Sequence, residues 1–373
     1  MQNASHNNVS EVVMSHSPTP RNFFSVDSHV VITSEQVKKN LASKFHSAWD
    51  EGITSYENHL NNELMGGEKL ELEDFVDLEA ASHPGYFDPV ERLKAMDADG
   101  VQCEVLYSEF DFTSKVYSLG KHWKECATAY NNTLHQFAAQ DPKRLLITYQ
   151  LPLIDIDYAV SEIYRLRDLG ARSIQIPNFP SELGMPDYHD HKYDPLWTAF
   201  SETGIVCANH LTLKQSLWDV FRRDPTPQKG IFTSLPGFAL AETIGWYILT
   251  GVCERFPKLK IVFVEPGLFW LSGYIKFLDE RMGHHYEFPD MKELPSTYWK
   301  RQMAATFVSE QAAIDDRHYL GVENIMWSTD FPHPCCNWPN AAAKVDSFFA
   351  GVPEEEIHKI TWENGAKMYG IAS

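Results

Sequence analysis

The segment Asn324-Ile-Met-Trp-Ser-Thr-Asp-Phe-Pro-His-Pro334 holds a short apolar run that ends in an acidic residue. Residues 324–329 are typical of a buried parallel strand, and Pro332 and Pro334 prevent that strand from continuing beyond Asp330. A carboxylate at the tip of a buried strand is unfavourable by several kcal/mol unless a metal ion or a charged partner compensates it. Asp330 could instead cap the helix that follows, and this segment alone leaves both interpretations open.

The rest of the chain repeats the order of strand, polar tip and helix. We expect strands over residues 23–27, 101–107, 145–151, 173–176, 205–208, 259–264, 304–308 and 324–329. Strands that alternate with helices indicate a parallel sheet, and eight such units predict a (β/α)8 TIM barrel with long loops at its C-terminal mouth. A doubly wound open sheet is the alternative, but no glycine-rich phosphate loop follows the first strand.

The division of the chain follows from its polar stretches. We expect residues 1–22 to form a disordered arm and residues 23–373 to form a single barrel domain. Residues 53–87 are acidic, and we expect them to form a surface insertion. We expect residues 211–237 to form a long loop of the kind that acts as a lid. We expect helices over residues 89–98, 123–139, 155–169, 195–202, 238–256, 270–282, 340–349 and 361–369.

Composition narrows the class of protein. The 373 residues are 43% hydrophobic and carry a formal net charge of −19, with no basic stripe. This charge argues against nucleic acids and anionic membranes as partners. No apolar run approaches the roughly 20 residues that span a bilayer, and no signal peptide is visible, so we expect a cytoplasmic protein. The expected partner is a small-molecule substrate, and a homodimer remains open.

The polar tips of the predicted strands are the candidate functional residues. In a parallel barrel every strand ends at the same mouth, so these side chains should converge. They are Asp27, His29, Glu109, His210, Glu265, Glu310 and Asp330, with His333 close by. Mutual repulsion would raise the carboxylate pKa values unless a cation lay among them. A metal site is therefore the favoured interpretation, and a network of caps and salt bridges is the alternative.

The loop over residues 211–237 supplies further candidates. It contains Trp218, Arg222 and Arg223, and either arginine could hold a substrate carboxylate through two parallel hydrogen bonds. A solvated arginine pair fits the sequence equally well. We expect substrate contacts from Trp218, Arg222 and Arg223, together with Glu109 and Glu310.

Four motifs resemble one known family. They are Val26-Asp-Ser-His-Val30, Asn209-His210, Glu254-Arg-Phe-Pro-Lys-Leu-Lys-Ile-Val-Phe-Val-Glu265 and Ser328-Thr-Asp-Phe-Pro-His-Pro334. The chain is similar over roughly residues 23–370 to the amidohydrolase-related proteins, which include aminocarboxymuconate-semialdehyde decarboxylase and carboxyvanillate decarboxylase. The resemblance implies a metal-dependent barrel that hydrolyses C–N or C–O bonds, or removes CO2 without oxidation.

The resemblance also implies roles for individual residues. The family's first-strand motif matches Asp27 and His29, its fifth-strand histidine matches His210, and its eighth-strand aspartate matches Asp330. The sixth-strand histidine that assists catalysis in many members is Glu265 here. We expect Asp27, His29, His210, Asp330 and Glu265 to hold the metal. Asp330, Glu265 and His333 are the expected catalytic residues, and Asp330 is the expected proton shuttle.

Three functions remain open on the sequence. The first is a hydrolase or non-oxidative decarboxylase that uses zinc or manganese and acts on an aromatic or cyclic carboxylic substrate. The second is a non-haem diiron oxygenase or hydroxylase, because oxygen ligands with a few imidazoles suit iron, and Glu265 could bridge two ions. The third is a binding protein that has kept the barrel without catalysis.

Overall fold

The fold is an eight-stranded parallel barrel. The computed structural model describes residues 22–67, 82–109, 112–282, 288, 290–333 and 336–371, so all but one residue of the expected disordered arm lies outside the described residues. Each strand pairs in parallel with the next one in chain order, as a (β/α)8 barrel requires. The strands are β1 (Phe23–Val30), β2 (Val101–Ser108), β3 (Leu145–Gln150), β4 (Ser173–Gln175), β5 (Val206–His210), β6 (Ile261–Val264), β7 (Met303–Phe307) and β8 (Ile325–Trp327). The predicted barrel is confirmed, and the open-sheet alternative is wrong.

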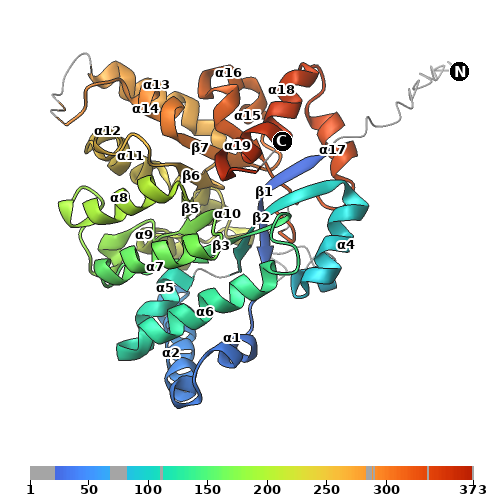
Figure 1. Ribbon diagram of the computed structural model, residues 1–373. Coiled ribbons are helices and arrows are strands. Elements are labelled where there is room, and N and C mark those ends of the chain that lie inside the picture. The colour runs from blue at the N-terminus through green and yellow to red at the C-terminus, as the bar shows by residue number, and fades with distance from the viewer. Residues whose placement is uncertain are drawn as a thin grey trace, which may run out of the picture.

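Helices surround the strands (Figure 1). Those that follow β1 are α1 (Ser34–Asn40), α2 (His46–Asn58), the π-helical turn η2 (His59–Leu64), the 3-10 turn η4 (Pro84–Tyr86) and α4 (Pro89–Asp99). Those between β2 and β6 are α5 (Phe112–Lys115), α6 (Trp123–Ala138), α7 (Ile156–Asp168), α8 (Asp194–Thr203), α9 (Gln215–Arg223), α10 (Gly230–Thr233), α11 (Ala241–Leu249) and α12 (Val252–Arg255). The remaining helices are α13 (Leu268–Met282), α14 (Pro295–Gln302), α15 (Gln311–Asp315), α16 (Arg317–Leu320), α17 (Ala341–Phe348), α18 (Glu354–His358) and α19 (Asn364–Tyr369).

Backbone hydrogen bonds join the end of the sheet to its beginning. Just past β8, the amide of Asp330 donates to the carbonyl of Asp27 at 2.9 Å. The amide of His29 in turn donates to the carbonyl of Phe331 at 2.7 Å. The amide of Thr329 donates to Ser25 Oγ at 2.8 Å. These bonds close the barrel at the C-terminal ends of its strands, where the predicted site lies.

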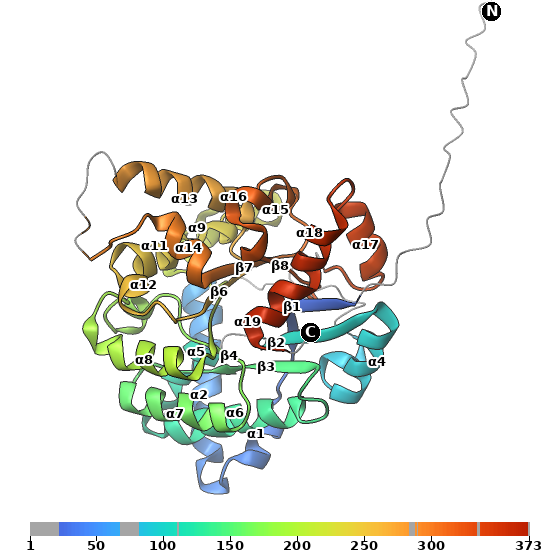
Figure 2. The same ribbon diagram turned by 45° about the horizontal axis from the view of Figure 1, so that its top comes forward.

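The barrel is filled by apolar side chains and covered below by the last helix. Phe24 and Val26 from β1 pack with inward-facing side chains from other strands and with Tyr369 of α19. Gly365 of α19 comes so close to the Phe24 ring that a Cβ there would lie 2.8 Å from it. Figure 2 shows α19 against β1 and β2. The apolar core therefore lies below the polar tips at the mouth.

Two predicted segments differ from the structure, and residues 68–81 of the expected surface insertion lie outside the described residues. The helix expected over residues 238–256 is divided into α11 and α12 at Gly251, whose φ of 74° ends one helix, and where a Cβ would lie 2.5 Å from the carbonyl oxygen of Asp290. The expected loop over residues 211–237 contains α9 and α10, because Trp218, Phe221 and Phe232 pack into a small core of their own. Among the described residues, every helix is too short or too polar to cross a bilayer.

Candidate metal centre

A bulge in β1 brings two of its polar side chains into the mouth. Val26 faces the barrel interior, and the pairing of β1 with β2 then shifts between Ser25 and Ser28. Such a bulge re-aims the side chains that follow it. Asp27 and His29 are consequently both buried beside each other, with His29 Nε2 3.7 Å from Asp27 Oδ1.

His210 at the end of β5 reaches the same point from the opposite side of the barrel. Its Nε2 lies 3.6 Å from Asp27 Oδ1 and 3.7 Å from Glu265 Oε2. Its Nδ1 lies 3.2 Å from the carbonyl of Leu211, and an Nδ1–H donated there leaves Nε2 directed at the carboxylates. The Asn178 side chain donates to the His210 carbonyl at 2.5 Å, which holds the backbone of the tip.

Asp330 and His333 complete the cluster after β8. Asp330 Oδ1 lies 3.3 Å from His29 Nε2 and 3.0 Å from His333 Nδ1. Asp330 and Glu265 both have a φ of 55°, a left-handed conformation that is uncommon for residues with a side chain. Strained backbone at two strand tips is typical of functional sites.

Glu109 borders the cluster after β2. Its Oε2 lies 3.6 Å from His29 Nδ1 and 3.5 Å from His333 Nε2, and it accepts a hydrogen bond of 2.6 Å from the Tyr86 hydroxyl. Glu109 therefore sits between two histidines and is held from behind by a tyrosine.

The donor atoms fit a divalent cation. Three overlapping groups each place one ligand atom per residue within 4.8 Å of one another: Asp27, His29, His210 and Glu265; His29, Glu109 and His333; Glu265, Asp330 and His333. Within the described part of the chain, both carboxylate oxygens of Asp27, both ring nitrogens of His29, Asp330 Oδ1 and His210 Nε2 are buried without a hydrogen-bond partner. Buried polar atoms are rarely left unpaired, so this set has the character of a ligand shell.

The charges of Asp27 and His210 depend on each other. Burial raises the pKa of Asp27 to about 6, against the attraction of His210. Burial alone would favour a neutral His210, but the carboxylates of Asp27 and Glu265 outweigh it and raise its pKa to about 9. Without a metal ion, a proton on this histidine thus offsets part of the negative charge, and a bound cation would take over that role.

The second half of the cluster shows the same balance. Burial opposes charge on Asp330 and on His333, yet each stabilises the charge of the other, which lowers the pKa of Asp330 and raises that of His333. Burial likewise opposes charge on Glu109, but His29 and His333 outweigh it and lower its pKa to about 2. In the described structure, the ion pairs of these mouth carboxylates are all with histidines.

The remaining predicted site residues lie elsewhere or have other partners. Glu310 accepts hydrogen bonds from the amides of Leu268 and Phe269 at 2.6 Å and 3.3 Å, so it binds the first turn of α13. Trp218 is buried in the small core of α9 and α10. Arg222 donates to the carbonyls of Glu63 and Leu64 and pairs with Asp219, while Arg223 is exposed. Trp218 and Arg222 thus hold the loop together, and their expected contacts with substrate stay predictions.

The sequence analysis did not identify three residues that support the site. Tyr86 holds Glu109, Asn178 holds the His210 backbone, and Arg92 is buried beneath His29. Of these three residues, only Arg92 could have been recognised from the sequence. It lies one turn before Met96 on the buried face of α4, and a charge on such a face indicates a buried ion pair.

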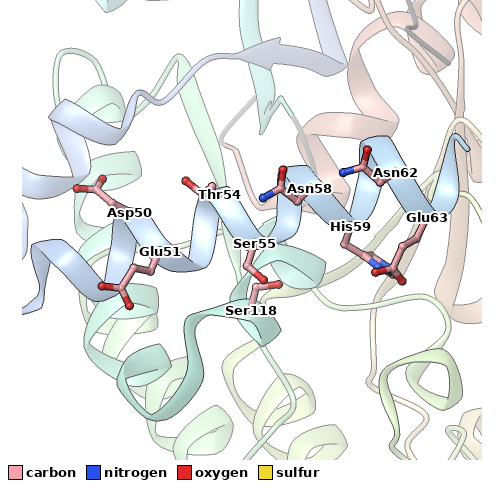
Figure 3. Close-up of a pocket in the computed structure, with 9 residues that line it drawn as sticks. All are labelled: Asp50, Glu51, Thr54, Ser55, Asn58, His59, Asn62, Glu63 and Ser118. Atoms are coloured by element: carbon pink, nitrogen blue, oxygen red, sulfur yellow. Dashed lines mark hydrogen bonds and ion pairs between the residues drawn. The ribbon is translucent and has the colours of Figure 1, made fainter. Parts of the chain in front are cut away.

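A hollow along α2 lies outside this cluster. Figure 3 shows its polar lining, which includes Asp50, His59 and Glu63. Asp50 is bonded to Lys38 Nζ at 2.6 Å, and Glu63 to His59 Nδ1 at 2.9 Å. The acidic groups of the hollow are thus already engaged, and none of the predicted site residues lines it.

The chain belongs to the amidohydrolase family, since the family model Amidohydro_2, described as amidohydrolase, matches residues 26–371. This match and the barrel confirm the resemblance seen in the sequence. Together with the donor cluster, they also confirm the prediction of a metal-dependent hydrolase or carboxy-lyase, without deciding between the two.

Solved structures support the fold. An amidohydrolase from Mycobacterium avium subsp. paratuberculosis K-10 is 18% identical in sequence and has a TM-score of 0.72. The match covers 94% of this chain and 98% of the amidohydrolase chain. The 5-carboxyvanillate decarboxylase LigW from Sphingomonas paucimobilis is 21% identical in sequence and has a TM-score of 0.63. The match covers 94% of this chain and 99% of the LigW chain. A dihydroxybenzoic acid decarboxylase from Polaromonas sp. JS666, which holds manganese and 2-nitroresorcinol, is 18% identical in sequence and has a TM-score of 0.63. The match covers 94% of this chain and 97% of the decarboxylase chain.

Proposed function

We propose that this protein is a divalent-metal-dependent enzyme that removes CO2 without oxidation from a small aromatic or cyclic carboxylic acid, or hydrolyses a related compound. The observation that carries the proposal is the convergence of Asp27, His29, His210 and Asp330, whose buried donor atoms lack hydrogen-bond partners among the described residues. The decarboxylases of similar fold, one of them with bound manganese, favour CO2 removal over hydrolysis.

The metal would be held by Asp27, His29, His210 and Asp330, with Glu265 as a further candidate ligand. When bound, such an ion binds and polarises an oxygen of the substrate or lowers the pKa of a water molecule. Arg223, whose side chain is exposed, stays the predicted partner of the substrate carboxylate.

The chain's own residues supply the proton. His333 Nδ1 and Asp330 Oδ1 lie 3.0 Å apart, and the raised pKa of His333 favours its protonated form. In decarboxylation the C–C bond to the carboxylate breaks, its electron pair stays on the ring carbon, and that carbon takes up a proton. Asp330 is the group placed to deliver it, with His333 as the reservoir.

The test is anaerobic turnover of metal-loaded protein on hydroxylated benzoic acids, amides and lactones, with CO2 release and hydrolysis products measured separately. We expect activity without oxygen, loss of activity after chelation, and recovery with manganese or zinc. H210A should lose most of its bound metal by elemental analysis, while H191A, which alters an exposed histidine, should retain it. A strict requirement for oxygen would rule out this function.

A diiron oxygenase is the second candidate, and one observation favours it. The donor groups overlap through Glu265, which belongs both to the set with Asp27 and His210 and to the set with Asp330 and His333. A carboxylate shared between two donor sets can bridge a pair of ions, and oxygen-rich donors suit iron. Two irons per chain together with oxygen consumption would establish this function, and one ion per chain with anaerobic turnover would exclude it.

A further inference from the structure

Arg92 on α4 and Glu104 on β2 form a buried ion pair directly beneath the candidate metal centre. Arg92 is 1% exposed and Glu104 3% exposed, and Arg92 Nε donates to Glu104 Oε2 at 2.6 Å. Taking two charges out of water is unfavourable, and an apolar pair of similar size is often at least as stable. Stability alone therefore does not explain why the chain places this pair here.

The guanidinium group of Arg92 contacts the backbone of a proposed metal ligand. Its Nη1 donates to the carbonyl of His29 at 3.0 Å, and more weakly to the carbonyl of Gly85 at 3.5 Å. The Gly85 backbone passes so close that a Cβ there would lie 2.9 Å from the Cα of Arg92. The turn η4 is therefore packed tightly against the helix that carries Arg92.

The same guanidinium group also holds the other side of the cluster. It lies 4.5 Å from the ring centre of Phe331, the residue directly after Asp330. Phe331 in turn accepts the backbone hydrogen bond of His29 at 2.7 Å. Arg92 thus contacts both partners of the bond that joins β1 to the segment after β8.

Glu104 extends this support to the bulge of β1. Its Oε1 accepts a hydrogen bond of 3.3 Å from Ser28 Oγ, and Ser28 lies between the two proposed ligands Asp27 and His29. The ion pair therefore touches the residue before His29, the carbonyl of His29 and the residue after Asp330. No atom of the pair is among the donor groups of the cluster.

We propose that Arg92 and Glu104 are positioning residues that set the separation of His29 and Asp330, and hence the affinity of the centre for its metal. This inference rests on the proposed metal site. A planar, forked guanidinium group can bond Glu104, bond the His29 carbonyl and stack on Phe331 at once, whereas an ammonium group cannot. The pair does more than dock α4, because the buried side chains of Ala95 and Met96 also pack that helix in place.

The test compares R92K with R165K. Arg165 pairs with the buried Glu162 on α7 at 2.7 Å, is itself 35% exposed, and lies outside the donor groups of the cluster. Binding of Mn2+ is measured by calorimetry, and the bound ion by electron paramagnetic resonance. We expect R92K to raise the Kd for Mn2+ by about ten- to one-hundred-fold and to alter the spectrum, while R165K changes neither. R92K should lose more thermal stability than R165K, because Arg92 is 1% exposed and Arg165 is 35% exposed.

The outcomes are distinct. Wild-type protein that binds no divalent metal would overturn the proposed function itself. Wild-type protein that binds Mn2+, with R92K giving the same Kd and spectrum, would overturn the positioning role alone. If R92K does not fold, the double variant R92M/E104M replaces the pair by apolar side chains, and F331L removes the stacked ring while keeping both charges. We expect weakened Mn2+ binding in each, and wild-type binding in either would contradict the proposal.

Discussion

The backbone amide of Asp330 donates a hydrogen bond of 2.9 Å to the carbonyl of Asp27, so a bond that closes the barrel also sets two mouth carboxylates side by side. Both carboxylates face His29 Nε2, Asp27 at 3.7 Å and Asp330 at 3.3 Å. Closure of the barrel and assembly of the donor cluster are therefore coupled, and a change at the closure should affect both.

Thr329→Val tests this coupling. The Thr329 hydroxyl lies 2.9 Å from Ser25 Oγ and 2.7 Å from Ser28 Oγ, in a buried network. Valine keeps the shape but removes both of these buried hydrogen bonds, so we expect a loss of about 1–3 kcal/mol in the free energy of unfolding by urea. Mn2+ binding should weaken as well. The control T198V removes a hydroxyl from the exposed face of α8. Equal behaviour of the two variants would show that closure does not depend on this network.

Asp330→Asn separates chemistry from folding. Asparagine tolerates the left-handed φ of 55° at this position and keeps the volume of the side chain, but it carries neither the charge nor a transferable proton. We expect turnover to fall by at least about 100-fold, the range lost with a general acid or base. The melting temperature should stay close to that of the wild type, since the barrel core lies below the mouth. Retained turnover would remove Asp330 as the proton carrier.

The positions of the strand tips were predictable because they follow local rules. Each strand is a short apolar run with a polar end, and the barrel topology brings these ends together without further information. Asp27, His29, His210, Glu265 and Asp330 were placed at the mouth on that basis, and the structure has them there. Asp27 and His29 additionally need the bulge in β1, which alternation along the sequence does not reveal.

Other features depended on contacts between distant segments. Arg222 bonds the carbonyls of η2, some 160 residues earlier, and this partner is invisible in the local sequence. The division of α11 from α12 depends on the close approach of Asp290 to Gly251. The hydrogen bond from Tyr86 to Glu109 joins the insertion after β1 to the tip of β2. Periodicity and propensity describe neighbours in sequence, and each of these contacts is made in the tertiary structure.

Glu310→Gln should change the pH dependence of stability. Burial raises the pKa of Glu310 above its ordinary value, against the hydrogen bonds that it accepts from Leu268 and Phe269. The folded protein therefore binds this proton more tightly than the unfolded chain, and stability contributed by the protonated form is lost as pH rises through the folded pKa. Glutamine can still accept both bonds and stays neutral.

We accordingly expect the stability of E310Q relative to the wild type to increase between pH 4 and pH 7, measured by urea unfolding at each pH. D315N, which neutralises an exposed carboxylate on α15, the helix that follows Glu310, is the control and should show no such trend. A difference between E310Q and wild type that is constant with pH would mean that the raised pKa of Glu310 has no part in stability.

The loop after β5 is tied to the insertion after β1, and these strands lie on opposite sides of the barrel. Arg222 of α9 donates to the carbonyl of Leu64 at 2.6 Å, and Met65 packs with Phe221 in the small core of α9 and α10. A contact between these two segments reaches from one side of the mouth to the other. The small core that supports it is separate from the main barrel core.

Trp218→Ala should therefore loosen this loop without unfolding the barrel. Trp218 is 9% exposed and packs against Phe221 and Phe232, with ring centres 5.8 Å and 5.9 Å away. Truncation of a buried aromatic ring costs about 3–5 kcal/mol, and here the loss falls on the small core alone. We expect faster proteolytic cleavage within residues 211–237 and a raised KM, with the melting temperature of the barrel nearly unchanged.

The control is F238A, which removes an aromatic ring that is 45% exposed near the end of the same loop and should leave the cleavage rate unaltered. Cleavage of W218A at the wild-type rate would show that the small core does not hold the loop in place.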